Sequence, residues 1–238
     1  RLAAGGLGRR EFLLIAGGLV VWLGQMAVKS HGRAVSAAVP VPVEAATPAV
    51  TANVHTKPAI APAAVETYSY NFDNGTADWN LPAGFWSWVP SEGGHALRGT
   101  GNYGARLAAH TGDVSSLRFR FRLEEMESGV TANLLENSST GVHVRYLVQF
   151  GIQEISISKQ QGPQPGPKLA VGFVPTSPKV FYEARILVGG GSVDVFLNGE
   201  PVVGVDDPNP PPPGFVGFHA WDNSVALVDD VEVQFGTE

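Results

Sequence analysis

The feature that most constrains the fold of this chain is a strict alternation of apolar and basic residues between Leu117 and Leu123. The run reads Leu-Arg-Phe-Arg-Phe-Arg-Leu. Successive side chains of a β-strand point to opposite faces of a sheet, so a period of two predicts a half-buried strand and not a helix. The leucines and phenylalanines are expected to face a core, and the arginines are expected to face away from it: Arg118, Arg120 and Arg122.

Strand patterns of this kind recur from about residue 67 to the C-terminus. Residues 142–148 alternate again, with Arg145 outward, and further strands are predicted over residues 152–157, 180–188, 193–197, 215–221 and 225–235. Asn198-Gly199 between two apolar runs predicts a type I′ hairpin turn. Proline-rich segments at 162–167 and 208–213 predict loops. We therefore expect residues 67–238 to form an all-β, two-sheet antiparallel sandwich of the jelly-roll type.

The N-terminal 33 residues follow a different pattern. Arg9 and Arg10 precede a run of seventeen uncharged residues from Phe12 to Val28, which as a helix would span roughly 25 Å. The run resembles a twin-arginine export signal and predicts either a signal cleaved after Ala37 or Ala38 or a retained single-pass transmembrane helix. A buried helix of a soluble domain is the remaining alternative. Residues 34–66, rich in Pro and Ala, predict an extended linker.

The composition narrows the location and the partners. The formal net charge of −6 argues against a nucleic acid partner, because binding to phosphates needs clustered cations. The sequence has no cysteine, which excludes disulfides, thiolate metal sites and a lipidated N-terminal cysteine. The N-terminal helix is therefore the expected tether, with the C-terminal domain on the periplasmic or extracellular side of the cytoplasmic membrane.

Several short motifs follow one another through the predicted sandwich. They are Phe-Asp-Asn-Gly…Trp at 72–79, Trp-Ser-Trp-Val at 86–89, His-Ala-Leu-Arg-Gly at 95–99, Val-x-Val-Phe-Leu-Asn-Gly-Glu at 193–200, Gly-Phe-Val-Gly-Phe at 214–218 and Asp-Asp-Val-Glu-Val at 229–233. Their kind and order resemble the concanavalin A-like lectin/glucanase superfamily, in its laminin-G-like and 3-keto-disaccharide-hydrolase-like branches. The resemblance covers about 170 residues and implies a fold that hosts both enzymes and binding modules.

Signs of catalysis are missing from the sequence. Laminarinase-type members of the superfamily carry Glu-x-Asp-x-x-Glu on one strand, and the sequence has no such motif. The nearest carboxylate cluster, at 124–127, reads as a charged turn. There is no Gly-x-Ser-x-Gly elbow, and the histidines show no metal-ligand spacing. We therefore expect no catalytic residues and a protein that is not an enzyme.

Three sets of surface residues are candidates for binding. The aromatic set, which could stack on sugars or anchor a protein partner, comprises Trp86, Trp88, Tyr103 and Trp221. The arginine row, which Arg145 and Arg185 could extend, would suit anionic groups. The resemblance also implies a structural Ca²⁺ held by oxygens of Asp73, Asn74, Asp229 and Asp230. The alternatives are core tryptophans, a polar face balanced by Glu183 and Glu154, and an ordinary Asp-Asn-Gly turn.

The sequence is compatible with two main functions. The first is a non-catalytic accessory subunit of a larger membrane protein complex, for example an energy-transducing one, with the helix packed among other helices. The alternative is a carbohydrate-binding or cell-envelope adhesion module, whose partner is a glycan. A glycoside or keto-sugar hydrolase is a third and weaker interpretation.

Overall fold

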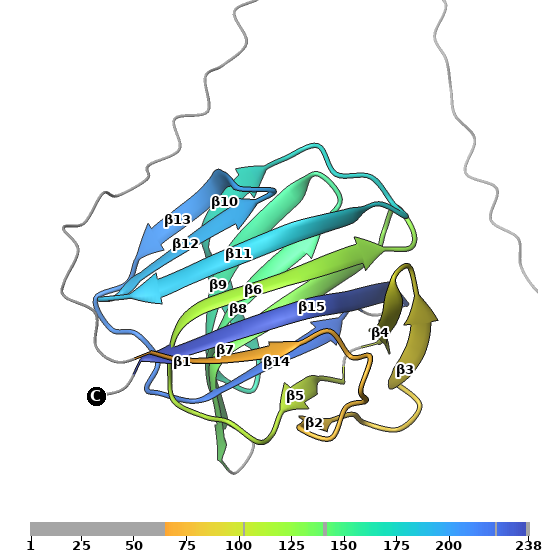
Figure 1. Ribbon diagram of the computed structural model, residues 1–238. Helices are drawn as coiled ribbons and strands as arrows, with labels where there is room; N and C mark the ends of the chain where they lie inside the picture. Colours follow the sequence, from red (N-terminus) through yellow and green to blue (C-terminus); the bar gives the residue numbers. More distant parts are fainter. Residues whose placement is uncertain (1–64, 102, 140–141, 222, 237–238) are drawn as a thin grey trace, which may run out of the picture. The chain divides into compact units, whose positions relative to one another are not determined.

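The computed structural model describes residues 65–101, 103–139, 142–221 and 223–236, and these form fifteen strands in two antiparallel sheets (Figure 1). Sheet A contains β1 (Val65–Tyr70), β3 (Trp86–Ser91), β4 (Gly94–Thr100), β6 (Asp113–Leu123), β11 (Phe181–Gly189), β12 (Ser192–Leu197), β13 (Glu200–Asp206) and β15 (Val225–Gly236). Sheet B contains β2 (Trp79–Asn80), β5 (Ala105–Leu107), β7 (Gly129–Ser139), β8 (Val142–Gly151), β9 (Glu154–Gly162), β10 (Pro165–Phe173) and β14 (Phe215–Ala220).

The predicted signal or anchor lies outside the described residues, as does nearly all of the predicted linker, so both stay predictions. The part of the chain that the structure describes contains no helix long and apolar enough to cross a membrane.

The two sheets stack face to face, with sheet A in front of sheet B in Figure 1. The strand order is β13-β12-β11-β6-β15-β4-β3 in sheet A and β10-β9-β8-β7-β14-β5-β2 in sheet B. Along one edge β15 pairs with β6, and along the other it pairs first with β4 and then with β1. Many neighbours in space are therefore distant in sequence, as in jelly rolls. The predicted two-sheet antiparallel sandwich is confirmed.

Aromatic side chains from both sheets meet in the core. The alternation in β6 buries Phe119 and Phe121, as predicted. Phe119 packs edge-on against Phe150 of β8, with ring centres 5.4 Å apart, and lies 4.9 Å from Phe218 of β14. Edge-to-face contacts at these distances are favourable beyond the area they bury. The core therefore fixes which face of each strand of sheet B turns outward.

The hairpin between β12 and β13 has the predicted turn. Asn198 and Gly199 both have positive φ, 50° and 85°. Two successive residues in the left-handed region define a type I′ turn, whose twist matches that of paired strands.

Several parts of the strand assignment differ from the sequence prediction, which placed no strand over β1 or β5. Residues 162–167 are not all loop, because β10 begins at Pro165. β10 is an edge strand of sheet B, where a proline need not donate to a ladder. No strand was predicted over residues 129–139 either, although these residues form β7, a central strand of sheet B.

Candidate functional site

A groove of about 620 Å³ lies on the outer face of sheet B. It is lined from β2, β5, β7, β8, β9 and β14, together with the segments that lead into β5 and β10. One register row crosses it from strand to strand: Asn80, Arg106, Gly217, Asn133, Leu147 and Ser158. Most outward positions here are polar, and several are almost fully buried: Thr131, Asn133, Ser156, Ser158 and Gln160. A polar and recessed sheet face is suited to hold a polar ligand.

A β-bulge in β7 directs Glu136 into the groove. Regular alternation would turn Leu135 outward and Glu136 into the core. Instead the register shifts between Leu134 and Asn137, and Leu135 adopts a positive φ of 53°. Both leucines are therefore buried, and Glu136 lines the groove. Bulges commonly re-aim a side chain in this way beside functional sites.

Glu136 and Arg145 form an ion pair in the groove, with 3.3 Å between Oε1 and Nη1. Arg145 Nε also donates to Gln160 Oε1 at 2.8 Å, which holds the guanidinium in place. Burial lowers the pKa of Arg145, and the charge of Glu136 opposes that shift. The pair is thus a fixed polar element of the groove wall.

Two buried polar atoms on this face of sheet B make no hydrogen bond within the described residues. They are Asn133 Oδ1 and His143 Nδ1. The latter lies 4.0 Å from Glu136 Oε1, which is too far for a hydrogen bond. Buried polar atoms in native proteins almost always have a partner, from the protein or from another molecule. Two of the four buried side-chain atoms without a hydrogen-bond partner in the described residues thus lie on this sheet face.

His219 of β14 faces the same groove. Burial, and then the positive charge of Arg145, lower its pKa from 6.5 to about 4. At neutral pH the ring is therefore uncharged, with one nitrogen that donates and one that accepts a hydrogen bond.

Aromatic residues stand near the groove. Tyr103, which is 58% exposed, lines it, and its ring centre lies 4.1 Å from that of Phe85. Trp221 follows β14 on the same face and donates from Nε1 to Thr131 Oγ1 at 3.1 Å. Its ring lies over Gly129, where a Cβ would come within 2.2 Å of it. The structure thus brings Tyr103 and Trp221 of the predicted aromatic set to this sheet face.

The other two predicted tryptophans lie on β3, in sheet A. Trp86 is a core residue, 4% exposed, and its Nε1 donates to the carbonyl oxygen of Tyr103 at 2.6 Å. Trp88 is 44% exposed and stacks on His95, with ring centres 4.0 Å apart. The structure therefore separates Trp86 and Trp88 from the groove.

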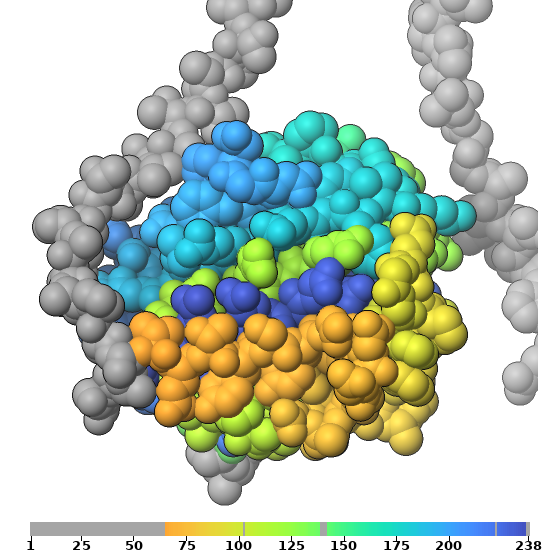
Figure 2. Space-filling model, in the orientation of Figure 1, coloured from red at the N-terminus to blue at the C-terminus, as the bar shows by residue number. Residues whose placement is uncertain are grey.

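The arginine row lies on the outer face of sheet A, where β6 (green) and β15 (dark blue) run between β1 (orange) and β11 (cyan) in Figure 2. Each arginine has a carboxylate partner: Arg118 with Glu232 at 3.2 Å and Glu183 at 4.0 Å, Arg120 with Asp230 at 3.0 Å, and Arg122 with Glu124 at 2.8 Å. Arg185 lies opposite Arg118 on β11, but Arg145 belongs to the other sheet. The predicted balancing residue Glu154 pairs with Lys168 instead.

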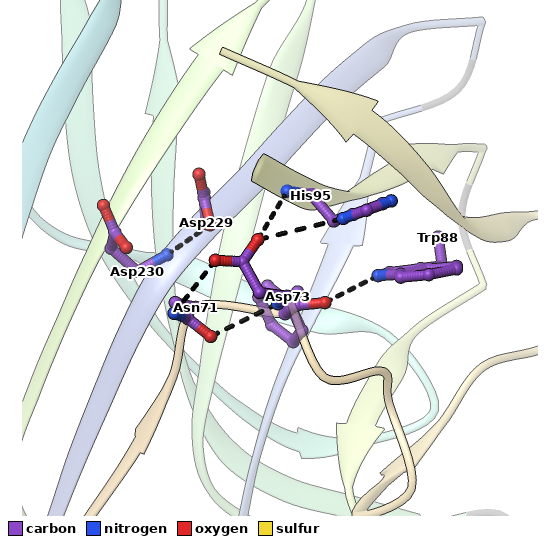
Figure 3. Close-up of polar contacts among 7 residues, drawn as sticks. Asn71, Asp73, Trp88, His95, Asp229 and Asp230 are labelled. Atoms are coloured by element: carbon purple, nitrogen blue, oxygen red, sulfur yellow. Dashed lines mark hydrogen bonds and ion pairs between the residues drawn. The ribbon is translucent and has the colours of Figure 1, made fainter. Parts of the chain in front are cut away.

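The predicted calcium ligands lie where β15 passes the turn after β1 (Figure 3). The two carboxylate oxygens of Asp73 accept from the backbone N–H of His95 at 3.1 Å and from Asn71 Nδ2 at 3.2 Å. Asp230 pairs with Arg120, while Asn74 is exposed. Burial raises the pKa of Asp229, whose Oδ1 accepts from the backbone N–H of Asp230 at 2.8 Å.

Within the described ranges, no three His, Asp or Glu side chains are grouped so that they could hold a metal ion. Binding of a structural Ca²⁺ by these residues stays a prediction.

The outward residues of β7 were not identified from the sequence. Thr131, Asn133 and Glu136 face outward from this strand, and Glu136 lines the groove. The signal that could have identified the strand is the Leu134-Leu135 doublet, which breaks an alternating pattern as a bulge does.

Comparison with known proteins shows the fold. No family model and no curated protein matches the sequence. Among solved structures, the carbohydrate binding module CBM66 from Bacillus subtilis matches with a TM-score of 0.53 and 12% identity, over 65% of this chain and 94% of that one. The Bacillus licheniformis β-glucanase matches with a TM-score of 0.57 and 8% identity, over 72% and 98%. A β-1,3-1,4-glucanase from a mouse hindgut metagenome gives 0.55 and 10%, over 72% and 99%.

The similarity to these structures is a similarity of fold. The described domain shares the two-sheet sandwich fold of these glucanases and of this binding module.

Proposed function

We propose that this chain is a carbohydrate-binding module that holds a glycan in the groove of sheet B. The observation that carries the proposal is the recessed polar groove, whose lining includes Asn80, Arg106, Gln149 and His219. Hydroxyl groups of a sugar both donate and accept hydrogen bonds, so they can pair with donors and acceptors of this kind. The exposed ring of Tyr103 at the groove offers a flat apolar surface for a sugar ring.

The fold gives this proposal independent support. One of the solved structures that share it is a carbohydrate binding module, and two are glucanases. The comparisons thus favour the carbohydrate-binding interpretation over the accessory subunit of a membrane complex, which neither they nor the described residues support. Membrane attachment through residues 12–28 remains a separate expectation that the groove does not depend on.

The composition of the groove favours binding without catalysis. Hydrolysis of a glycosidic bond ordinarily uses two carboxyl groups, one on each side of the bond. Among the residues that line the groove, Glu136 is the one carboxylate, and Arg145 neutralises it. Thr131 and Asn133 occupy the outward positions of β7 where further acids would have to stand.

Glycan-array screening followed by calorimetric titration tests the proposal. We expect a glycan ligand whose affinity falls about tenfold or more in Gln149→Ala, because Gln149 lines the groove and a hydrogen bond to the sugar is lost. Trp88→Ala is the matched control, since this exposed tryptophan lies outside the groove. Absence of glycan binding, or loss of binding in Trp88→Ala with full binding in Gln149→Ala, would contradict a sugar site in this groove.

A further inference from the structure

The charge of the groove points to the chemical class of its glycan. We infer, on the basis of the proposed function, that the groove takes a glycan with an anionic substituent, a carboxylate or a sulfate ester, and that Arg106 holds that substituent.

The groove carries one uncompensated positive charge. Its cationic lining residues are Arg106 and Arg145, and its carboxylate is Glu136. Glu136 and Arg145 are 3.3 Å apart and neutralise each other. Arg106 makes no ion pair with any described residue, and the lowered pKa of His219 leaves that ring neutral at pH 7. This local excess of positive charge stands out in a chain whose net charge is −6.

The guanidinium of Arg106 is held in place without using its N–H groups. Its central carbon lies 4.6 Å from the centre of the Phe215 ring, as in a stacked cation–π pair. This contact with the ring face does not itself use the N–H groups of the guanidinium. A planar fork of donors matches the oxygens of a carboxylate or sulfate. In contrast, each arginine of the row on sheet A already has a carboxylate partner.

Arg106 and Asn133 lie close together on the outer face of sheet B. The two residues lie in one register row, on either side of Gly217. Because adjacent strands are about 4.8 Å apart, the two residues are roughly 10 Å from each other. A Cβ at position 217 would lie 2.5 Å from the carbonyl oxygen of Ala105, so this gap must stay free of a side chain. A sugar with its anionic group at Arg106 extends along the groove, whose lining includes Tyr103, Gln149 and His219.

The test compares neutral, uronate and sulfated forms of the same oligosaccharide backbones on one array, followed by titration of the best pair. We expect the anionic forms to bind more tightly than the neutral form. Their affinity should fall as the salt concentration rises. In Arg106→Gln the affinity for the anionic form should fall at least about tenfold, as for loss of a charge-assisted hydrogen bond, while affinity for the neutral form should change less than about twofold. The uronate and sulfate arms identify which anionic group is recognised.

Arg98→Gln is the matched control, because Arg98 is an exposed arginine of sheet A that does not line the groove. Equal binding of neutral and anionic forms, unchanged in Arg106→Gln, would overturn the role of Arg106 and leave the proposed function standing. Absence of binding to every form would contradict both the role of Arg106 and the proposed carbohydrate-binding function.

Discussion

Gly129 and Gly151 determine where the ring of Trp221 lies. A Cβ at Gly129 would come within 2.2 Å of the indole, and one at Gly151 within 2.8 Å. We expect Gly129→Ala to displace the ring and to lower the free energy of unfolding by about 1–3 kcal/mol, the usual range for overpacking. Chemical denaturation followed by tryptophan fluorescence measures both effects. In Gly189→Ala, where a Cβ meets no atom within 4 Å, the indole signal should not change.

His219 makes stability depend on pH. Its pKa is about 4 in the folded protein, because burial and the charge of Arg145 disfavour the protonated ring, and about 6.5 in the unfolded chain. Between these values the unfolded state binds more protons, so stability is retained above about pH 6.5 and lost as the pH falls toward 4.

The loss from this one residue should amount to at most about 3 kcal/mol. Urea denaturation between pH 7 and pH 4 measures it. The same series on His219→Gln should show a shallower dependence on pH, and an identical slope would contradict the shifted pKa.

Asp207 anchors a second, interior polar cluster. Its Oδ2 accepts from Tyr146 Oη at 2.9 Å and from Lys159 Nζ at 2.8 Å, and both charged side chains are nearly buried. Burial alone would raise the pKa of Asp207, but hydrogen bonds from Lys159, the backbone N–H of Asn209 and Tyr146, together with the charge of Lys159, outweigh it and the pKa is lowered. Asp207→Asn should cost about 3–5 kcal/mol, because the ammonium of Lys159 is left without a counter-charge.

A double-mutant cycle with Lys159→Met checks this explanation. The double variant should be more stable than Asp207→Asn alone, since no buried charge is left unpaired. Strictly additive losses would show that the two groups do not interact.

At the scale of elements, the β12–β13 hairpin depends on backbone conformation more than on packing. Gly199 has a φ of 85°, and a Cβ there would meet no atom within 4 Å. Gly199→Ala should therefore destabilise the protein by about 1–2 kcal/mol through the left-handed conformation alone. Thermal unfolding measures the difference. Gly189→Ala is a matched control, because that position is equally open and its φ is not positive; an equal loss in both variants would contradict the turn assignment.

Elements with clear alternation could be predicted from the sequence, and those without it could not. The pattern from Leu117 to Leu123 predicted β6 and its buried face, and Asn198-Gly199 predicted the hairpin. β7 was missed because Leu134-Leu135 interrupts its alternation, and the bulge that explains the doublet depends on pairing with β8. The start of β10 was missed because Pro165 reads as a loop residue unless the strand is known to be an edge.

The candidate site was less predictable than the fold for the same reason. Tyr103 and Trp221 were identified by residue type alone, and Arg145 was correctly placed on an outward face. Arg106 and Asn133 are 27 residues apart in sequence, and only the pairing of β5, β14 and β7 places them in one row.

At the scale of the whole sandwich, its two outer faces differ in kind. On sheet A, the outward arginines of β6 are paired with carboxylates. On sheet B, the outward side is a recessed polar groove with atoms that lack partners in the described chain. The face of sheet A thus has a pocket of about 270 Å³ lined in part by ion-paired residues, whereas the groove on sheet B is about 620 Å³.

Localising a bound glycan on the sandwich tests this account most directly. Amide chemical shifts of the ¹⁵N-labelled chain would be recorded during titration with the glycan that binds best on the array. We predict that the largest shifts fall on sheet B, at Arg106, Asn133, Arg145 and His219. Shifts concentrated around Trp88 and the arginine row of sheet A, or no shifts with any glycan, would contradict it.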